Sequence, residues 1–246
     1  MENPEIFEKI QILYEDEHLL AIDKPSGLVV HSDGKTDEPS VADWLMHTYP
    51  KLADVGEPWK RPDGAVIPRP GIVHRIDRDT SGVLLVCKDN ETFAAIKKKF
   101  QNREMEKSYY AFVYGEIHDR TGIIDRPIAR SRKDFRLWSA QRGARGEERD
   151  AVTAYAVLQS SNGFTFVEAR PKTGRTHQIR VHLKAINHPV ICDRLYAPKR
   201  EAGLGFTRLA LHAAKLSFSF DDRQFVIESP MPEDFQRAFN ILSSQQ

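Results

Sequence analysis

Two strand-like runs that follow each other directly set the fold class of this chain. Residues 151–159 (AVTAYAVLQ) and 163–171 (GFTFVEARP) are rich in β-branched and aromatic residues, and the turn-forming letters SSNG join them. Such a pair predicts an antiparallel hairpin, because parallel strands need a connection of a dozen residues or more. Other expected strands alternate with helices. The sequence therefore favours an α+β fold, with a large mixed and mainly antiparallel sheet flanked by helices, over a doubly wound fold.

The expected elements follow one another without a linker that would divide the chain. Residues 50–70 carry five prolines and predict an irregular surface loop. A short helix is expected to start after Ser40 and to bury Val41, Leu45 and Met46. Further strands are expected at 12–14, 19–22, 83–87, 107–115, 208–220 and 224–230, and further helices at 90–105, 176–187 and 232–242.

A chain of 246 residues can bury a sizeable core, and we expect one domain over residues 1–246. We expect it to have two lobes that share a sheet. No apolar run reaches the roughly 18–20 residues that a membrane span needs, and the acidic N-terminus lacks a signal-peptide pattern. The two cysteines, Cys87 and Cys192, stand alone, which argues against a disulfide framework or a zinc site. We therefore expect a cytoplasmic protein, with a monomer as the default.

The net charge of +1 conceals a strong asymmetry along the chain. Residues 1–43 hold three Lys and Arg against eleven Asp and Glu. Residues 120–149, where we expect hairpins, hold nine basic against four acidic residues, and residues 168–184 hold five against one. Such segments are typical of a surface that binds a polyanion, since phosphate contacts supply much of nucleic-acid affinity. A solvated surface with chance clustering is the alternative that charge alone leaves open.

The segment GIVHRIDRDTSGVLLV, residues 71–86, places four charges between two apolar stretches. Asp77 lies between Arg75 and Arg78, and neighbouring cations keep a carboxylate ionised. The letters DTSG that follow supply turn-forming groups that can hold the backbone around it. We interpret Asp77 as a candidate functional carboxylate, with a structural salt bridge to either arginine as the alternative. Asp79 looks more like a turn former.

A second dense group of polar residues is RPKTGRTHQIRVHL at 170–183. Lys172, Arg175 and a helix N-terminus near Thr176 can bind phosphate through charge and backbone N–H groups together. Arg180 lies one turn inside that helix on a partly buried stripe, so it needs an anionic partner, and Asp77 is a suitable one. His177 and His182 are five residues apart and share a helical face poorly, so we do not expect them to bind a metal.

These stretches together resemble the RluA-type pseudouridine synthases. Residues 74–82 are similar to the family's HRLDxxTSG motif, with Ile76 in place of leucine. KSYYAFVYG at 107–115 is similar to its K-x-Y-x-A-x-V-x-G strand, and residues 170–196 to its TGRTHQIR-x-H…HP-x-x-GD-x-x-Y block. RLALHA at 208–213 is similar to its late R-L-x-L-H-A strand. The motifs occur in the family's order over nearly the whole chain.

The resemblance implies the pseudouridine synthase fold with a central active-site cleft, and it assigns roles to individual residues. Asp77 would be the catalytic aspartate, Tyr109 would stack on the uracil and act as a base, and Arg180 would form a salt bridge to Asp77. Leu209 or Leu211 would supply an apolar wall of the uracil pocket. The residues expected to contact RNA are Arg75, which would enter the RNA where the target nucleotide leaves the stack, and His74, Lys172, Arg175, Thr176 and His177.

The implied reaction isomerises specific uridines of structured ribosomal or transfer RNA to pseudouridine, without a metal or another cofactor. The sequence does not name the RNA or the position. The chain departs from the family at Cys192, where glycine is common before Asp193, and we expect no separate S4 RNA-binding domain. The basic segment 120–149 is expected to share the binding of RNA. Two alternatives are a non-catalytic RNA-binding module and a nucleosidase or glycosidase that uses Asp77 and Asp79 as its two carboxylates.

Overall fold

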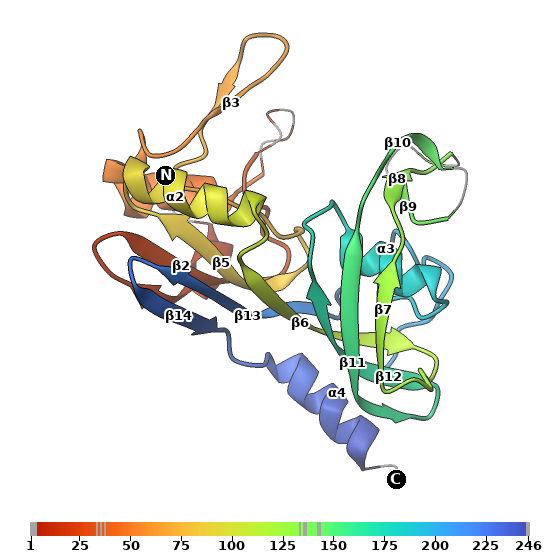
Figure 1. Cartoon of the computed structure of the whole chain (residues 1–246). Helices are drawn as coiled ribbons and strands as arrows, with labels where there is room; N and C mark the ends of the chain where they lie inside the picture. The colour runs from red at the N-terminus through yellow and green to blue at the C-terminus, as the bar shows by residue number, and fades with distance from the viewer. Residues whose placement is uncertain are drawn as a thin grey trace. The chain divides into compact units, whose positions relative to one another are not determined.

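The chain folds into two compact units (Figure 1). Unit 1 contains Met1–Met105 and Lys215–Ser229, and unit 2 contains Glu106–Ala214 and Pro230–Gln246. The strand β13 (Leu211–Phe220) therefore begins in unit 2 and ends in unit 1. The expectation of a single domain stays a prediction. The computed structural model describes residues 4–32, 34, 36, 38–132, 134, 137–141 and 144–244.

Unit 1 is built on antiparallel strands. β1 (Gln11–Glu15) pairs with β2 (Leu19–Lys24), and β2 pairs with β5 (Ser81–Cys87). Every residue of β5 is buried, which agrees with its uninterrupted apolar letters SGVLLVC. The last part of β13 pairs with β14 (Arg223–Glu228). The strands expected at 12–14, 19–22 and 83–87 are thus confirmed.

Helices of unit 1 bury one apolar side each. α1 (Val41–Thr48) begins after Ser40, and Ser40 and Asp43 form a reciprocal capping box. Its buried side includes Trp44, whereas Met46 is exposed, so the expected burial of Met46 is wrong. The remaining elements are the 3₁₀ turns η1 (Glu5–Lys9) and η2 (Pro50–Leu52), the hairpin of β3 (Trp59–Lys60) and β4 (Val66–Ile67), and α2 (Asn90–Gln101).

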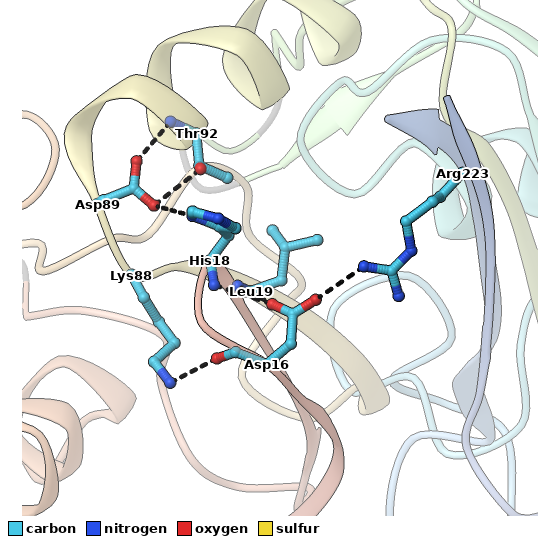
Figure 2. Close-up of polar contacts among 7 residues, drawn as sticks. All are labelled: Asp16, His18, Leu19, Lys88, Asp89, Thr92 and Arg223. Carbon is cyan, nitrogen blue, oxygen red and sulfur yellow. Dashed lines mark hydrogen bonds and ion pairs between the residues drawn. The ribbon is translucent and has the colours of Figure 1, made fainter. Parts of the chain in front are cut away.

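A network of polar side chains joins the start of α2 to the β1–β2 turn (Figure 2). Asp89 caps α2 by accepting hydrogen bonds from Thr92 N and Thr92 Oγ1, both at 2.8 Å. The same carboxylate lies 2.9 Å from Nδ1 of His18. Asp16 accepts hydrogen bonds from the backbone N–H groups of His18 and Leu19. The side chains of the turn at residues 15–18 (EDEH) are therefore hydrogen-bonded to the backbone of the turn itself and to the capping residue of the helix.

Unit 2 contains a run of four neighbouring strands among the residues described: β6 (Glu106–Tyr114), β12 (Phe164–Pro171), β11 (Val152–Ser161) and β7 (Thr121–Asp125). All their pairings are antiparallel. The turn between β11 and β12 passes through Asn162 and Gly163, which both have positive φ values of 52° and 78°. This backbone suits asparagine and glycine in a tight hairpin turn. The hairpin expected from the sequence is therefore confirmed, and with it the mainly antiparallel α+β fold.

The basic segment of unit 2 forms a small sheet in which β8 (Ile128–Arg130) pairs with β9 (Trp138–Ser139) and β10 (Arg145–Arg149). Residues 133, 135, 136, 142 and 143 of this segment lie outside the described residues. α3 (Gln178–Ala185) is shorter than the helix expected at 176–187, and α4 (Glu233–Ser243) matches the expected C-terminal helix. Of the helices described, none has the length and apolar character needed to cross a membrane.

Candidate active site

The predicted site residues divide between the two units. His74, Arg75 and Asp77 belong to unit 1, in the connection before β5. Tyr109 and Arg180 belong to unit 2, as do the other residues assigned by the resemblance. The salt bridge between Asp77 and Arg180 would join the units and stays a prediction. The local structure of each group shows how the chain holds it in place.

A buried lysine holds the backbone beside Asp77. The side chain of Lys24 is fully buried at the end of β2. Its ammonium group donates hydrogen bonds to the carbonyl oxygens of Pro25 at 2.8 Å, Leu28 at 2.7 Å and Arg78 at 2.9 Å. Burying an ammonium group is costly unless its protons are bonded, and these three oxygens satisfy that need. Lys24 therefore ties the turn after β2 to the carbonyl next to Asp77.

The turn that follows Lys24 makes two more bonds to the same loop. The backbone N–H of Gly27 donates to the carbonyl of Arg78 at 3.0 Å, and Ser26 Oγ donates to the carbonyl of Asp79 at 2.7 Å. From the sequence, residues 24–27 (KPSG) predict a turn, but they do not reveal that this turn holds the Asp77 loop. A lysine directly after a buried apolar strand was the signal that could have found it.

Apolar packing anchors the other side of the Asp77 loop. Ile76, which replaces the leucine of the family motif, is buried. His74 accepts a hydrogen bond from the backbone N–H of Leu85 at 2.8 Å, and its ring stacks on Phe100 with centroids 4.6 Å apart. His74 thus has a packing role within unit 1, while its expected contact with RNA stays a prediction. The charged loop is fastened to β5 and α2 at this point.

The four charges of the loop differ in their surroundings. Asp77 is half-buried, whereas Arg75, Arg78 and Asp79 are exposed. Arg78 Nη2 lies 2.5 Å from Oε2 of Glu38. The backbone N–H of Thr80 donates to the carbonyl of Asp77 at 3.2 Å, which closes the turn. Asp77 is thus the acidic group that the fold partly withdraws from solvent.

Arg180 has a partner in its own unit that the sequence did not reveal. Its Nε donates to Asp193 Oδ2 at 2.7 Å, and its Nη2 donates to Asp193 Oδ1 at 2.8 Å. Asp193 Oδ1 also accepts the backbone N–H groups of Leu195 and Tyr196, both at 3.0 Å. The guanidinium carbon lies 5.1 Å from the ring centroid of Tyr196. Asp193 and Tyr196 stood in the family block, and they orient Arg180.

The turn before Asp193 keeps the left-handed backbone that glycine usually supplies. Cys192 has a φ of 57°, and its thiol donates to the carbonyl of Phe206 at 3.3 Å. Burial raises the pKa of this thiol. The doubt that Cys192 raised about the turn is therefore answered for its conformation. A cysteine in the left-handed region costs about 1–2 kcal/mol that a glycine would not.

Gln178 fastens the start of α3 to the sheet. Its side-chain oxygen accepts from Thr173 Oγ1 at 2.6 Å and from Arg175 N at 3.0 Å. Its side-chain nitrogen donates to the carbonyl of Val152 and to Thr153 Oγ1, both at 3.0 Å. All its hydrogen-bonding groups are thus used inside the fold. Gln178 was not singled out from the sequence, although it stands in the middle of the motif.

The expected phosphate-binding residues lie at and before the start of α3. Lys172 and Thr176 are exposed. Arg175 Nε donates to the carbonyl of Asp150 at 3.1 Å. His177 precedes the helix with a left-handed φ of 56°, and its Nδ1 lies 2.9 Å from the hydroxyl of Tyr196. The helix N-terminus therefore begins two residues later than the sequence predicted.

Tyr109 lies on β6 and packs half-buried against the main core of unit 2. Leu209 and Leu211 are buried in that same core, each 4 % exposed. Lys107 precedes Tyr109 by two residues and so shares its face of the strand. Its amine donates to the carbonyl of Thr173 at 3.4 Å, and burial lowers the pKa of Lys107. Strand β6 therefore connects Tyr109 with the loop before α3.

His182 takes part in a buried polar network. Its Nε2 faces the carbonyl of Arg126 at 2.9 Å and must donate there, so its Nδ1 accepts from Thr153 Oγ1 at 2.9 Å. Burial lowers the pKa of His182, which agrees with this neutral form. In the part of the chain that the structure describes, no three His, Cys, Asp or Glu side chains gather as metal ligands.

The comparison with family models decides what this arrangement belongs to. Residues 18–185 match the model described as RNA pseudouridylate synthase. The chain belongs to this family. The match includes Asp77, Tyr109 and Arg180 but ends before Leu209 and Leu211. The synthase isomerises uridine in RNA to pseudouridine.

Curated relatives agree with this membership. The synthase is 36 % identical to "Ribosomal large subunit pseudouridine synthase D" of Zymomonas mobilis, over 95 % of this chain and 73 % of that protein. It is 36 % identical to the protein of the same name from Xanthomonas campestris, over 95 % and 69 %. It is also 37 % identical to "Uncharacterized RNA pseudouridine synthase YlyB" of Bacillus subtilis, over 92 % and 70 %.

Solved structures agree on the fold. "Human RNA Pseudouridylate Synthase Domain Containing 4" superposes with a TM-score of 0.73 at 25 % identity, covering 94 % of this chain and 92 % of that chain. "Human RNA Pseudouridylate Synthase Domain Containing 1" gives the same TM-score at 23 % identity, covering 94 % and 87 %. The pseudouridine synthase fold expected from the motifs is thus confirmed.

A cavity of about 470 Å³ in unit 2 of the synthase lies between α3 and the basic segment. Its lining includes Trp138, Tyr196, Arg132 and Lys184. The guanidinium of Arg130 covers the ring of Trp138 at 4.1 Å. Cationic and aromatic side chains suit the binding of an RNA strand. The contribution of the basic segment to RNA binding stays a prediction.

Proposed function

We propose that this synthase modifies large-subunit ribosomal RNA and that Asp77 is its catalytic residue. The proposed target rests on the 36 % identity, over 95 % of the chain, to a protein named as a ribosomal large subunit pseudouridine synthase. The observation that carries Asp77 is the half-buried carboxylate in a loop held by Lys24, Ser26 and Gly27. A reacting group gains most from a fixed position.

The reaction conserves all atoms of the substrate. The N1–C1′ bond breaks, the uracil rotates, C5 bonds to C1′, and the proton that C5 loses is replaced at N1. The carboxylate of Asp77 starts the reaction, either by attack at C1′ or by removal of a ribose proton. Both routes need the carboxylate beside the sugar and the uracil retained until it rejoins. Neither route uses a metal or a second substrate.

Arg180 is proposed to position the carboxylate of Asp77. Asp193 accepts from Nε and Nη2 of Arg180, and we propose that another N–H of the same guanidinium donates to Asp77. The pair with Asp193 balances the arginine charge within unit 2, and the bonds to Leu195 N and Tyr196 N hold Asp193 in turn. A guanidinium held in this way can donate to a second carboxylate without a change of its own position.

Tyr109 is proposed to stack on the flipped uracil and to act as a base in the late proton transfer from C5. Its half-buried position against the core that contains Leu209 and Leu211 supports this role. Aromatic stacking and an apolar wall together retain a free base in a pocket, because both lower the free energy of the uracil relative to water.

Access to the uridine requires that it leave the RNA stack, at a cost of a few kcal/mol. Arg75 is proposed to occupy the vacated place, supported by its exposed position two residues before Asp77. His74, Lys172, Arg175, Thr176 and His177 are proposed as further RNA contacts. An RNA substrate fits a cytoplasmic enzyme, and we propose that the synthase acts there as a monomer.

The test of the catalytic assignment is the pair Asp77→Asn and Asp79→Asn, assayed on ribosomal RNA from cells lacking the protein. Release of tritium from [5-³H]uridine measures the new C5 bond. We expect Asp77→Asn to lower the rate by about 10²–10⁴-fold or more, with RNA binding retained. Asp79→Asn removes the neighbouring exposed carboxylate and should leave the rate within about threefold.

Two outcomes would contradict the proposal. Appreciable pseudouridine from purified Asp77→Asn or Asp77→Ala would remove Asp77 from catalysis. Free uracil as the product would identify a nucleosidase instead. Arg180→Ala should also lose activity by releasing Asp77, and near-normal turnover there would refute the pairing. Mapping the modified positions in the RNA of cells with and without the protein identifies the target.

A further inference from the structure

Arg69 and Arg75 of unit 1 lie in the segment that leads from the β3–β4 hairpin into the Asp77 loop. Among the residues that the structure describes, neither guanidinium has an ion-pair or hydrogen-bond partner. Two other arginines of the unit are paired: Arg61 Nη2 lies 2.6 Å from Asp63, and Arg78 is paired with Glu38. Within the described part of the chain, Arg69 and Arg75 are thus two arginines without an anionic partner.

Arg69 is held in position although it lacks an anion. Its guanidinium carbon lies 5.3 Å from the ring centroid of Trp59, on β3. Its Nε is fully buried and has no hydrogen-bond partner, whereas its terminal nitrogens are not among the buried unpaired atoms. The backbone carbonyl of Arg69 accepts from Ile72 N at 3.2 Å. The stem is thus fixed, and the end that can bind an anion faces outward.

Burial and neighbouring positive charge both disfavour the charged form of Arg69. Burial, followed by the charge of Arg75, lowers the pKa of Arg69. Burial lowers the pKa of His31 as well, and the charges of both arginines add to this effect. Like charges that gather without a counter-charge destabilise a fold, so such a group is usually kept for a ligand. An anion bound to the guanidinium of Arg69 would offset this repulsion.

We propose that Arg69 binds a phosphodiester group of the RNA substrate. This inference rests on the proposed function and adds Arg69 to the residues that hold the RNA next to Asp77. A guanidinium binds phosphate oxygens through two parallel N–H donors, and the contact with the Trp59 ring limits the positions of that fork. Arg69 lies eight residues before the carboxylate of the catalytic loop, so the phosphate that it holds would be near the target nucleotide.

The test measures binding of a fluorescein-labelled 20-nucleotide single-stranded RNA by anisotropy over a series of KCl concentrations. We expect Arg69→Gln to raise the Kd about 5–10-fold and to lower the slope of log K against log salt by about 0.7, the value for one phosphate contact. Arg237→Gln is the matched control, because Arg237 is an exposed arginine on α4. It should leave both quantities unchanged.

Arg69→Lys keeps the charge but loses the planar fork, so we expect it to keep the salt slope and to lose about two- to threefold in affinity. Circular dichroism melting confirms that each variant is folded. Wild-type slope and affinity in folded Arg69→Gln would overturn the proposal. So would a loss of slope in Arg69→Lys equal to that in Arg69→Gln, since the packing on Trp59 would then explain it.

The same proteins separate this inference from the proposed function. In one outcome, Arg69→Gln has a lower salt slope than the wild type, but the wild type forms no pseudouridine in ribosomal RNA. The proposed target or the catalytic assignment then fails, and the phosphate contact stands. In the other outcome, the wild type forms pseudouridine, and Arg69→Gln has the same affinity, salt slope and activity as the wild type. The phosphate contact then fails, and the proposed function stands.

Discussion

At the scale of single residues, Arg180 and Asp193 illustrate what burial adds to an ion pair. Their side chains are 7 % and 0 % exposed, and the contact is bidentate. Arg208 and Asp234 form a bidentate pair of the same geometry in the same unit, but with side chains 21 % and 19 % exposed. The two pairs differ chiefly in how far water can replace a lost partner.

We expect Asp193→Asn to destabilise the protein by about 3–5 kcal/mol, because the buried Arg180 loses the bidentate carboxylate of Asp193. Asp234→Asn should cost on the order of 1 kcal/mol, because water can solvate Arg208. Urea unfolding of both variants measures the difference. Equal losses would mean that burial does not control the strength of these pairs. Asp193→Asn should also reduce isomerisation at temperatures where it remains folded.

Cys192 tests the cost of a left-handed backbone. At most positions glycine is less stable than alanine, since it loses more backbone freedom on folding. At a φ of 57° the order should reverse, and we expect Cys192→Gly to be more stable than Cys192→Ala by about 1 kcal/mol. Both variants lose the thiol contact with Phe206, so their difference isolates the backbone term. Thermal unfolding at one pH compares the two variants. A Cys192→Ala variant more stable than Cys192→Gly would show that the left-handed backbone carries no such cost.

At the scale of elements, polar side chains decide where helices begin. α2 begins at the capping aspartate that the letters DNET suggest, whereas α3 begins where Gln178 is bonded to β11 and to the loop before it. Its N-cap, His177, makes no capping bond. A capped start can be predicted from neighbouring letters. A start set by a long-range side chain cannot.

The contact between the β1–β2 turn and α2 predicts a pH dependence (Figure 2). The hydrogen bond to Asp89 raises the pKa of His18. Burial alone would raise the pKa of Asp89, but its hydrogen bonds from Thr92 and His18 outweigh it and lower that pKa. The His18 contribution is thus complete below the imidazole's unfolded pKa and is lost as pH rises through the folded one. The Asp89 contribution is lost as pH falls through its own folded pKa.

NMR titration of the His18 ring measures this contact. We expect its pKa to lie above the ordinary histidine value and to return toward that value in Asp89→Asn. The stability difference between Asp89→Asn and the wild type should shrink as pH rises through the His18 pKa. A His18 pKa that is unchanged by Asp89→Asn would show that the two side chains do not interact in solution.

At the scale of the whole molecule, the chain order does not match the division into units. The core of unit 1 combines residues of its first segment, such as Leu85 and Phe93, with residues of β13 and β14 more than a hundred positions later. Those late strands supply Leu216, Phe218, Phe225 and Ile227. Unit 1 therefore cannot complete its core until most of the chain has been made.

We expect a fragment of residues 1–105 to remain unfolded. It lacks four buried apolar side chains that each contribute about 1.5–3 kcal/mol, which is comparable with the whole stability of a small domain. The same fragment joined to residues 215–229 by a Gly/Ser linker should unfold cooperatively. A linked version with Leu216→Ser and Phe218→Ser is the control and should not. Circular dichroism in urea distinguishes them, and cooperative unfolding of residues 1–105 alone would contradict this account of the core.

The sequence by itself determined the fold class, most element positions and the family. Apolar periodicity, turn letters and motif spacing are local properties of the chain, so the β11–β12 hairpin and the run of family motifs could be read directly. The same local reading overextended α3 at its start and buried Met46 instead of Trp44. The start of α3 and the buried face of α1 are both set by packing against distant segments, which the local sequence does not show.

Only the tertiary structure decided which polar groups meet. Lys24 lies 54 positions from the carbonyl of Arg78 that it binds, and Gln178 lies 26 positions from that of Val152. Asp193 is close to Arg180 in sequence, yet only the turn through Cys192 directs it there. The energy of each contact depends on burial and exact geometry, which emerge when distant segments pack together. The proposed pairing of Asp77 with Arg180 is a contact of the same kind.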